Sequence, residues 1–249
     1  MRETFKRILR GYLILSLLII GWLSSANVVE AKQSTKASDE PKVIAIDPGY
    51  QQKAANGKEP VGPGAFKTTS GVISGNIGEE TQYAEYEMNL DIARKLENIL
   101  EDKGYTVILT RYSSDVNISD SGRAMMANTA EADIMVGITA NSDGSLTDNG
   151  VEIICQSEDN PYNYGNYGRA RLLSDAVLGS IVQSTGNSKG DVIEDDNRPI
   201  INWSIVPTTI IEVGSLANSA DEELLVTDEY QEEIAEGIAA GIESYFTQK

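Results

Sequence analysis

The residues with the clearest potential for chemistry are polar side chains that interrupt or directly follow strongly apolar runs. Glu212 lies near the end of the apolar run 207–213. A carboxylate in a buried strand loses its hydration, so it must be paired, bound to a metal, protonated or exposed at a crevice. At a crevice it can act as a general base. A strand-end glutamate that simply reaches water is the alternative.

Two other apolar runs are followed by polar residues. Asp47 and Tyr50 come after the run 43–46, which the Pro-Gly pair at 48–49 stops, and Thr139 comes after a similar run. In open α/β sheets, ligands bind where the carboxyl ends of parallel strands meet. We therefore expect these side chains to face one crevice.

The elements that must position these residues alternate between strands and helices. Such alternation implies right-handed crossovers and a largely parallel sheet. We predict an α/β fold, a three-layer sandwich with a mostly parallel, mixed central sheet and helices on both faces. Strands are expected at 43–46, 105–110, 133–138, 150–156 and 207–213, and helices at 84–103, 119–130, 167–184 and 228–246. Segment 51–82 has no sustained helical or strand period and is long enough to be a functional or disordered loop, while segment 187–199 is rich in turn residues.

The amino-terminal region is typical of an export signal. Residues 1–31 combine a basic start, a short apolar stretch at 12–23 and a small-x-small cleavage site. The alternative is an uncleaved membrane anchor formed by residues 12–23. Residues 32–41 are predicted to be a flexible linker, and residues 42–249 one folded domain. We expect a secreted or cell-wall-associated protein, outside the cytoplasm.

Charge and cysteine content exclude several functions. Without residues 1–31 the chain has 16 basic and 36 acidic residues, a formal net charge of −20. Such a charge argues against nucleic acid and anionic lipid surfaces as partners. Cys155 is the single cysteine, so no intrachain disulfide can form, and its apolar strand explains it better than reactivity does.

Four blocks together resemble the zinc-dependent N-acetylmuramoyl-L-alanine amidases that trim bacterial peptidoglycan. The resemblance spans residue 42 to about residue 245 and makes 42–249 an amidase-like domain. The blocks are KVIAIDPGY at 42–50, E-x-x-x-N-L at 85–90, GITAN at 137–141 and PTTIIEVGSLAN at 207–218. The resemblance implies that Glu85 is the glutamate zinc ligand and Glu212 the catalytic glutamate. Tyr50 and Thr139 occupy the positions of the two histidine ligands.

The sequence contains no histidine, and this departure bears directly on catalysis. A phenol with a pKa near ~10 and an alcohol are poor zinc ligands at neutral pH. We therefore expect no zinc and no other cofactor. Without a metal, water keeps a pKa near ~15.7, and Glu212 has no activated water to deprotonate. The sequence predicts a pseudoenzyme on an amidase fold.

Three hypotheses follow, from different functional classes. The first is a module that binds peptidoglycan or muropeptides without cutting them. The second is an active amidase with an altered site, in which oxygen ligands hold Mg²⁺ or Ca²⁺ or two carboxyls act without a metal. The third is a regulator of an active amidase or another envelope enzyme. The predicted ligand-binding residues are Tyr50, Glu85, Arg123, Thr139 and Asn141, with Glu212 in the catalytic position.

The two retained glutamates, Glu85 and Glu212, are also expected to affect each other's pKa. Without a dication between them, Glu85 and Glu212 are two like charges in a poorly hydrated crevice, so at least one is expected to titrate above the ~4.3 of a free glutamate. We expect the larger rise at Glu212, because Glu85 lies in the first turn of a predicted helix, where the dipole favours the anion.

Overall fold

The computed structural model describes residues 40–55, 57–141, 150–186 and 189–248. The predicted signal peptide 1–31, the alternative anchor 12–23 and all of the linker except residues 40 and 41 lie outside these ranges. Within the described ranges, no helix is both long enough and apolar enough to cross a membrane.

A six-stranded sheet forms the centre of the fold. In order across the sheet the strands are β4 (Thr106–Leu109), β1 (Val43–Pro48), β5 (Ile134–Thr139), β8 (Thr208–Glu212), β6 (Val151–Cys155) and β7 (Lys189–Glu194). The first four are parallel to one another, β6 is antiparallel to β8, and β7 is parallel to β6. The predicted mixed, mostly parallel sheet is confirmed.

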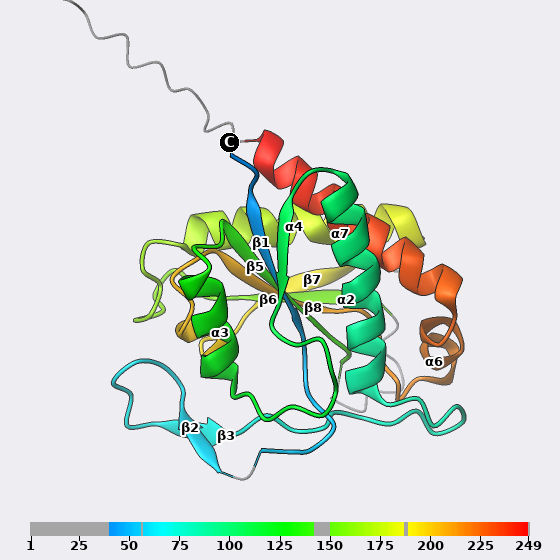
Figure 1. The fold of residues 1–249 in the computed structure, drawn as a ribbon, viewed down its shortest axis with the longest axis horizontal. Helices are drawn as coiled ribbons and strands as arrows, with labels where there is room; N and C mark the ends of the chain where they lie inside the picture. The colour runs from blue at the N-terminus through cyan, green and yellow to red at the C-terminus, as the bar shows by residue number, and fades with distance from the viewer. Residues whose placement is uncertain (1–39, 56, 142–149, 187–188, 249) are drawn as a thin grey trace, which may run out of the picture. The chain divides into compact units, whose positions relative to one another are not determined.

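Helices cover both faces of this sheet. The helices α2 (Glu85–Asp102), α4 (Tyr167–Thr185) and α7 (Asp228–Thr247) share the larger hydrophobic core with one face. The helices α3 (Asp120–Thr129) and α5 (Pro199–Asn202) contribute to a smaller core on the other. One further helix, α6 (Ser219–Leu225), precedes α7. Figure 1 shows α3 on one side of the sheet and α2 with α7 on the other, which confirms the three-layer prediction.

Local sequence explains how the longer helices pack against the sheet and where two of them begin or end. The buried residues Met88, Ile92 and Leu96 recur along one face of α2, and they pack in the larger core. Ser119 caps α3, since its side chain accepts a hydrogen bond from the backbone nitrogen of Gly122. Gly186 ends α4 with a φ of 71°, in the left-handed region that favours glycine.

The structure contains short elements that the sequence did not predict. The strands β2 (Lys58–Pro60) and β3 (Thr68–Ser70) form a hairpin within segment 51–82. Figure 1 shows this hairpin in cyan below the carboxyl end of β1. The strand β7 and the helix α5 lie in or beside segment 187–199, and α6 was also missed. Three- to seven-residue elements have too few residues to establish a hydrophobic period, and contacts distant in sequence stabilise them instead.

Candidate functional site

The turn after β1 brings Tyr50 to the end of β5. The amide nitrogen of Gly49 donates to the carbonyl oxygen of Ile138 at 2.9 Å. A Cβ atom at Gly49 would lie 2.5 Å from Cγ2 of Thr139, so only glycine permits this close approach. Tyr50 follows with a φ of 61°, an uncommon left-handed conformation for a non-glycine residue. The structure thus places Tyr50 and Thr139, the residues predicted to occupy the two histidine positions, on neighbouring strand ends.

The side chain of Arg123 holds this turn in place. Its guanidinium is fully buried and pairs with Asp47, with Nη1 2.8 Å from Oδ1. It also donates to the carbonyl oxygens of Pro48 and Tyr50, both at 3.0 Å. Arg111, which was not predicted as a site residue, donates to the carbonyl oxygens of Pro48 and Gly49. Both arginines therefore fix the backbone that presents Tyr50.

Glu85 is completely buried in the first turn of α2, and both of its carboxylate oxygens accept backbone hydrogen bonds. Oε1 accepts from the nitrogen of Ala140 at 2.7 Å, and Oε2 from the nitrogen of Asn76 at 2.8 Å. Burial raises the pKa of Glu85 to about 7 even though these hydrogen bonds lower it. The raised pKa of Glu85 agrees with the expectation that at least one of the two glutamates titrates above its ordinary range, and the larger rise expected at Glu212 stays a prediction.

Residues 71–82, here called the strap, lie over Glu85 and the ring of Tyr50. A Cβ atom at Gly75 would be 2.6 Å from Oε2 of Glu85 and 2.9 Å from Cδ2 of Tyr50. At its other end the strap is held by Glu222 of α6, whose Oε1 accepts from the nitrogen and the hydroxyl of Thr81 at 2.8 and 2.6 Å. Two buried carboxyl groups therefore hold the strap in place.

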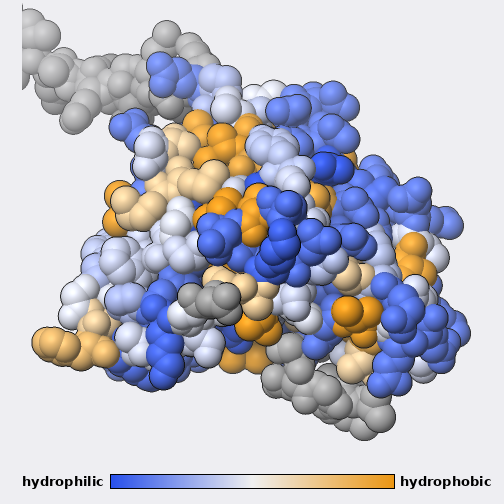
Figure 2. Space-filling view, turned by 60° about the horizontal axis from the view of Figure 1, so that its bottom comes forward, coloured by the Kyte–Doolittle hydropathy of each residue, from blue (hydrophilic) through white to orange (hydrophobic). Residues whose placement is uncertain are grey.

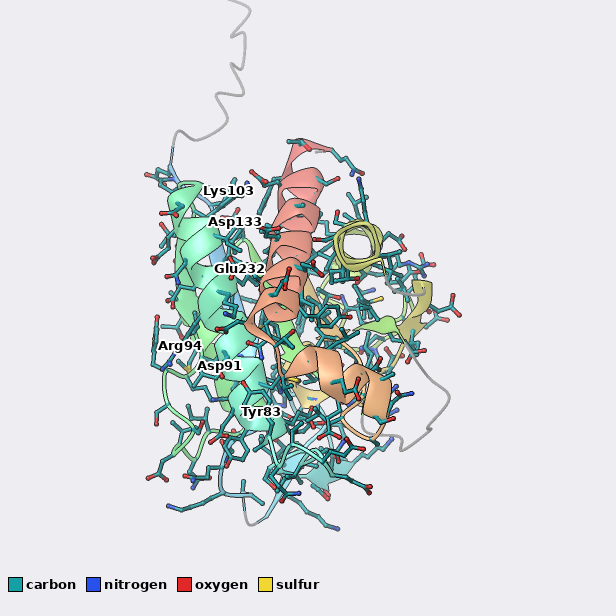
Figure 3. All side chains as sticks on the ribbon, turned by 90° about the vertical axis from the view of Figure 1, so that its right-hand side faces the viewer. Tyr83, Asp91, Arg94, Lys103, Asp133 and Glu232 are labelled. Carbon is teal, nitrogen blue, oxygen red and sulfur yellow. The ribbon has the colours of Figure 1, made fainter. Side chains whose placement is uncertain are left out.

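The strap leads into α2 through Tyr83. The Tyr83 hydroxyl donates to Oδ2 of Asp91 at 2.5 Å and accepts from Nε2 of Gln231 in α7 at 3.4 Å. Figure 3 shows Tyr83 and Asp91 near the same end of α2, with α7 alongside. The entry to α2 is thus tied to the helix layer as well as to the strap.

Glu212 lies at the carboxyl end of β8, between two polar neighbours. It is paired in register with Thr139 of β5 on one side and with Glu152 of β6 on the other. Asn141 links the same strands, since its backbone nitrogen donates to Gly214 at 2.7 Å and its Nδ2 contacts Oε2 of Glu152 at 3.4 Å. The structure therefore brings Glu212, Thr139 and Asn141 together, as expected.

A cavity of about 290 Å³ opens beside these strand ends, on the side of α3 and α5. Tyr50 and Thr139 form part of its wall, and the other polar lining residues include Asp120, Arg198, Thr69 and Ser70. The other predicted site residues, Glu85, Arg123, Asn141 and Glu212, are not among the described residues that line it. Figure 2 brings this face forward and shows many hydrophilic groups with separate hydrophobic spots between them.

Burial and nearby charges raise the pKa values of two residues that line the cavity, Asp120 and Tyr50. Burial and the neighbouring carboxylates Asp47 and Glu59 raise the pKa of Asp120 to about 7, while Arg198 lowers it. Burial raises the pKa of Tyr50 well above its ordinary value, and the nearby charge of Glu85 adds to this effect. Tyr50 is therefore a neutral phenol at physiological pH.

The donor set does not fit zinc. Catalytic zinc sites use three protein ligands drawn from imidazole, thiolate and carboxylate, whereas Tyr50 and Thr139 offer neutral hydroxyls. Glu85, at the third position, is then the one carboxylate of the set, and its oxygens also accept two backbone hydrogen bonds. In the part of the chain that the structure describes, no group of three His, Cys, Asp or Glu side chains is arranged to hold a metal ion.

Sequence reasoning missed Asp120 and Arg198. Asp120 lies in the first turn of a predicted helix, where acidic residues are common, and Arg198 lies in a turn-rich segment. Only the order of the strands brings the start of α3 and the start of α5 to one cavity. Their separation of 78 positions left no local signal by which the pair could have been recognised.

Comparisons with known proteins agree with this geometry. The sequence profile of the N-acetylmuramoyl-L-alanine amidase family matches residues 44–244. The chain is similar to the crystal structure of an N-acetylmuramoyl-L-alanine amidase from Clostridium difficile 630, with 26% identity and a TM-score of 0.69. It is also similar to the catalytic domain of the amidase CwlV from Bacillus (Paenibacillus) polymyxa var. colistinus, with 27% identity and a TM-score of 0.66. Each likeness covers 84% of this chain and 99% of the other.

A curated relative matches over a shorter stretch. The uncharacterized protein YqiI of Bacillus subtilis (strain 168) is 34% identical over 56 residues. This stretch covers 22% of the present chain and 27% of that relative.

Proposed function

Because this chain belongs to the N-acetylmuramoyl-L-alanine amidase family, we propose that it binds peptidoglycan or muropeptides at the carboxyl ends of its strands without hydrolysing them. The amidases that it resembles in sequence and fold are active enzymes by name. We attribute the proposed loss of hydrolysis to the residues that occupy the catalytic positions of this chain.

The residues at the two positions matched to the histidine ligands are the single observation that carries the proposal. The chain has no histidine, and Tyr50 and Thr139 offer neutral hydroxyls in their place. Glu85, whose oxygens accept backbone hydrogen bonds from Ala140 and Asn76, is one carboxylate ligand and does not make a zinc site alone. We therefore propose that the protein has no resident zinc.

Without a bound zinc, Glu212 has no metal-activated water from which to remove a proton. A general base accelerates hydrolysis when the proton that it removes belongs to an activated nucleophile. Bulk water has a pKa near ~15.7, against ~7 for zinc-bound water, so Glu212 alone is a weak catalyst of amide hydrolysis. What this site retains is a polar crevice and an adjoining cavity, which suit binding.

A protein that binds peptidoglycan must act where peptidoglycan lies. We propose that residues 1–31 direct export and that the folded domain acts outside the cytoplasm. Retention at the membrane by residues 12–23 is the alternative.

Co-sedimentation with purified peptidoglycan sacculi tests the binding proposal. The full chain is expected to pellet with sacculi, and Tyr50→Asn is expected to weaken this binding at least about fivefold. Asparagine tolerates the left-handed backbone at position 50, so the fold is retained. Tyr164→Asn is the matched control, because Tyr164 has a φ of 52° and is exposed. It is expected to bind as the wild type does.

Other results would identify the alternatives. A wild-type chain that stays in the supernatant contradicts peptidoglycan binding, and a pull-down with an active amidase would then test the regulatory hypothesis. A chain that pellets and solubilises sacculi in the presence of Mg²⁺ or Ca²⁺ supports an active enzyme with an altered metal site.

A further inference from the structure

The cavity beside Tyr50 contains an arginine with free hydrogen-bonding capacity. Nε of Arg198 donates to Oδ2 of Asp195 at 2.8 Å, and the side chain is 42% exposed. Among the described residues, none accepts a hydrogen bond from either terminal nitrogen of this guanidinium. These two nitrogens form the planar fork that binds carboxylates in bidentate fashion. Arg198 can therefore receive a second carboxylate while keeping Asp195.

Asp120 supplies an opposite charge in the same cavity. Its backbone nitrogen donates to Oε1 of Glu59 at 3.2 Å, but no described residue forms a hydrogen bond or ion pair with its side-chain carboxyl. The neighbouring carboxylates are engaged elsewhere: Asp47 pairs with Arg123, and Glu59 accepts from the amides at the start of α3. Asp120 is thus the carboxyl group best placed to meet a cation entering this cavity.

The size and lining of the cavity restrict the ligand further. Its volume of about 290 Å³ lies just below the range of ~300–1,000 Å³ for small-molecule sites. It suits one residue-sized group and not a disaccharide. Thr69 and Ser70 add hydroxyl groups, while Ile200 and Ile210 provide an apolar surface for a short aliphatic stem.

We propose that this cavity binds a free α-amino carboxylate head group of a peptidoglycan stem peptide, with the carboxylate on Arg198 and the ammonium on Asp120. This inference rests on the proposed function and names the part of the ligand that is recognised. A diaminopimelyl residue carries such a head group at the end of an aliphatic side chain. A lysyl residue at the same position carries the ammonium but lacks the carboxylate, so the cavity selects the diaminopimelyl peptide.

Calorimetric titration of the full chain with two muramyl tripeptides tests this selection. The peptides differ only at the third residue, which is meso-diaminopimelate in one and L-lysine in the other. The wild type is expected to bind the diaminopimelyl peptide at least about tenfold more tightly. Amidation of the distal carboxylate is expected to abolish the difference, since it removes the group that Arg198 recognises.

Two variants separate the roles of the charged residues. Arg198→Gln is expected to lose the preference while keeping affinity for the lysyl peptide, whereas Asp120→Asn is expected to weaken binding of both peptides. Arg171→Gln is the matched control, because Arg171 is 40% exposed and its Nε contacts Asp175 on α4, away from the cavity lining. This control is expected to keep the wild-type preference.

The results with the two peptides and with sacculi show separately whether the diaminopimelyl preference and peptidoglycan binding hold. Equal affinity of the wild type for both peptides overturns the inference and leaves peptidoglycan binding intact. A preference that survives in Arg198→Gln also overturns it. Failure of the wild type to bind either peptide or sacculi contradicts the inference and the proposed function together. The far-ultraviolet circular dichroism spectrum and the urea unfolding midpoint of each variant show whether a lost preference comes from unfolding.

Discussion

At the scale of single residues, the carboxyl groups near the strand ends serve different purposes. Glu85 is enclosed and bonded to two backbone amides, while Asp120 faces a cavity without a hydrogen-bond partner among the described residues. The pKa of each is raised to about 7, mainly by burial. Such groups bind protons more tightly in the folded state than in the unfolded state, so ionising them destabilises the fold.

Asp120→Asn tests this effect at one residue. Below the unfolded-state pKa of 3.8, Asp120 is protonated in both states and the substitution is expected to change little. As the pH rises towards about 7 the wild type loses stability, because the unfolded chain releases this proton first. At pH 8 the variant is expected to be more stable by roughly 1–3 kcal/mol, measured by urea unfolding.

Asp228→Asn is a control for which stability at pH 8 is expected to change in the opposite direction. Asp228 stands at the start of α7, as Asp120 does at the start of α3, but Lys95 lowers its pKa through a hydrogen bond of 2.8 Å. This substitution is expected to reduce stability at pH 8 and to have less effect below the lowered pKa. An Asp120→Asn chain that is no more stable than the wild type at pH 8 would show that another group already neutralises Asp120.

At the scale of elements, the strap determines how much of the site is open. It covers Glu85 and Tyr50 through Gly75, and Glu222 of α6 fixes its far end. A buried acceptor that satisfies several donors is costly to remove, at about 1–3 kcal/mol. The strap therefore depends on α6, an element outside the sheet.

Glu222→Ala is expected to loosen the strap without unfolding the sheet. Amide hydrogen exchange at Glu80 and Thr81 is expected to accelerate, because their backbone nitrogens donate to Glu222, while β1 and β5 keep wild-type protection. Glu223→Ala changes the exposed neighbour on the same helix and is expected to leave exchange unchanged. Equal exchange in all three chains would mean that the strap is held from elsewhere.

The elements also show what could be predicted from sequence. Helix α2 was predicted to within a residue at each end because its apolar spacing is regular over 18 residues. The hairpin of β2 and β3 was missed because its three-residue strands depend on remote contacts. One is the bond from Nε1 of Trp203 to the carbonyl oxygen of Pro60 at 3.1 Å. Tyr50 and Thr139 were found by matching blocks, whereas Asp120 and Arg198 required the folded chain.

At the scale of the whole molecule, the fold of an amidase is retained, and we propose that Tyr50 and Thr139 occupy positions where the family has metal-binding histidines. Parallel strands bring Tyr50, Thr139 and Glu212 to one edge from positions far apart in the sequence. Because the scaffold is intact, imidazoles returned to two positions are expected to bind zinc again.

The double substitution Tyr50→His with Thr139→His tests this expectation. After incubation with excess zinc and gel filtration, the variant is expected to retain close to one zinc per chain, and the wild type far less. Tyr164→His is the control, since it adds one imidazole at a similar backbone φ of 52°. A folded double variant that retains no zinc would show that Glu85, held by its two backbone amides, no longer serves as a ligand.

We propose that this amidase-family protein binds peptidoglycan and leaves its amide bonds intact. The most direct measurement is the release of free amino groups from purified sacculi incubated with the full chain and zinc, beside an active amidase of the family. We predict no release above the protein-free control, even in samples where the chain pellets with the sacculi. Release that increases with protein concentration and disappears in Glu212→Gln would contradict the claim and establish the protein as an active amidase.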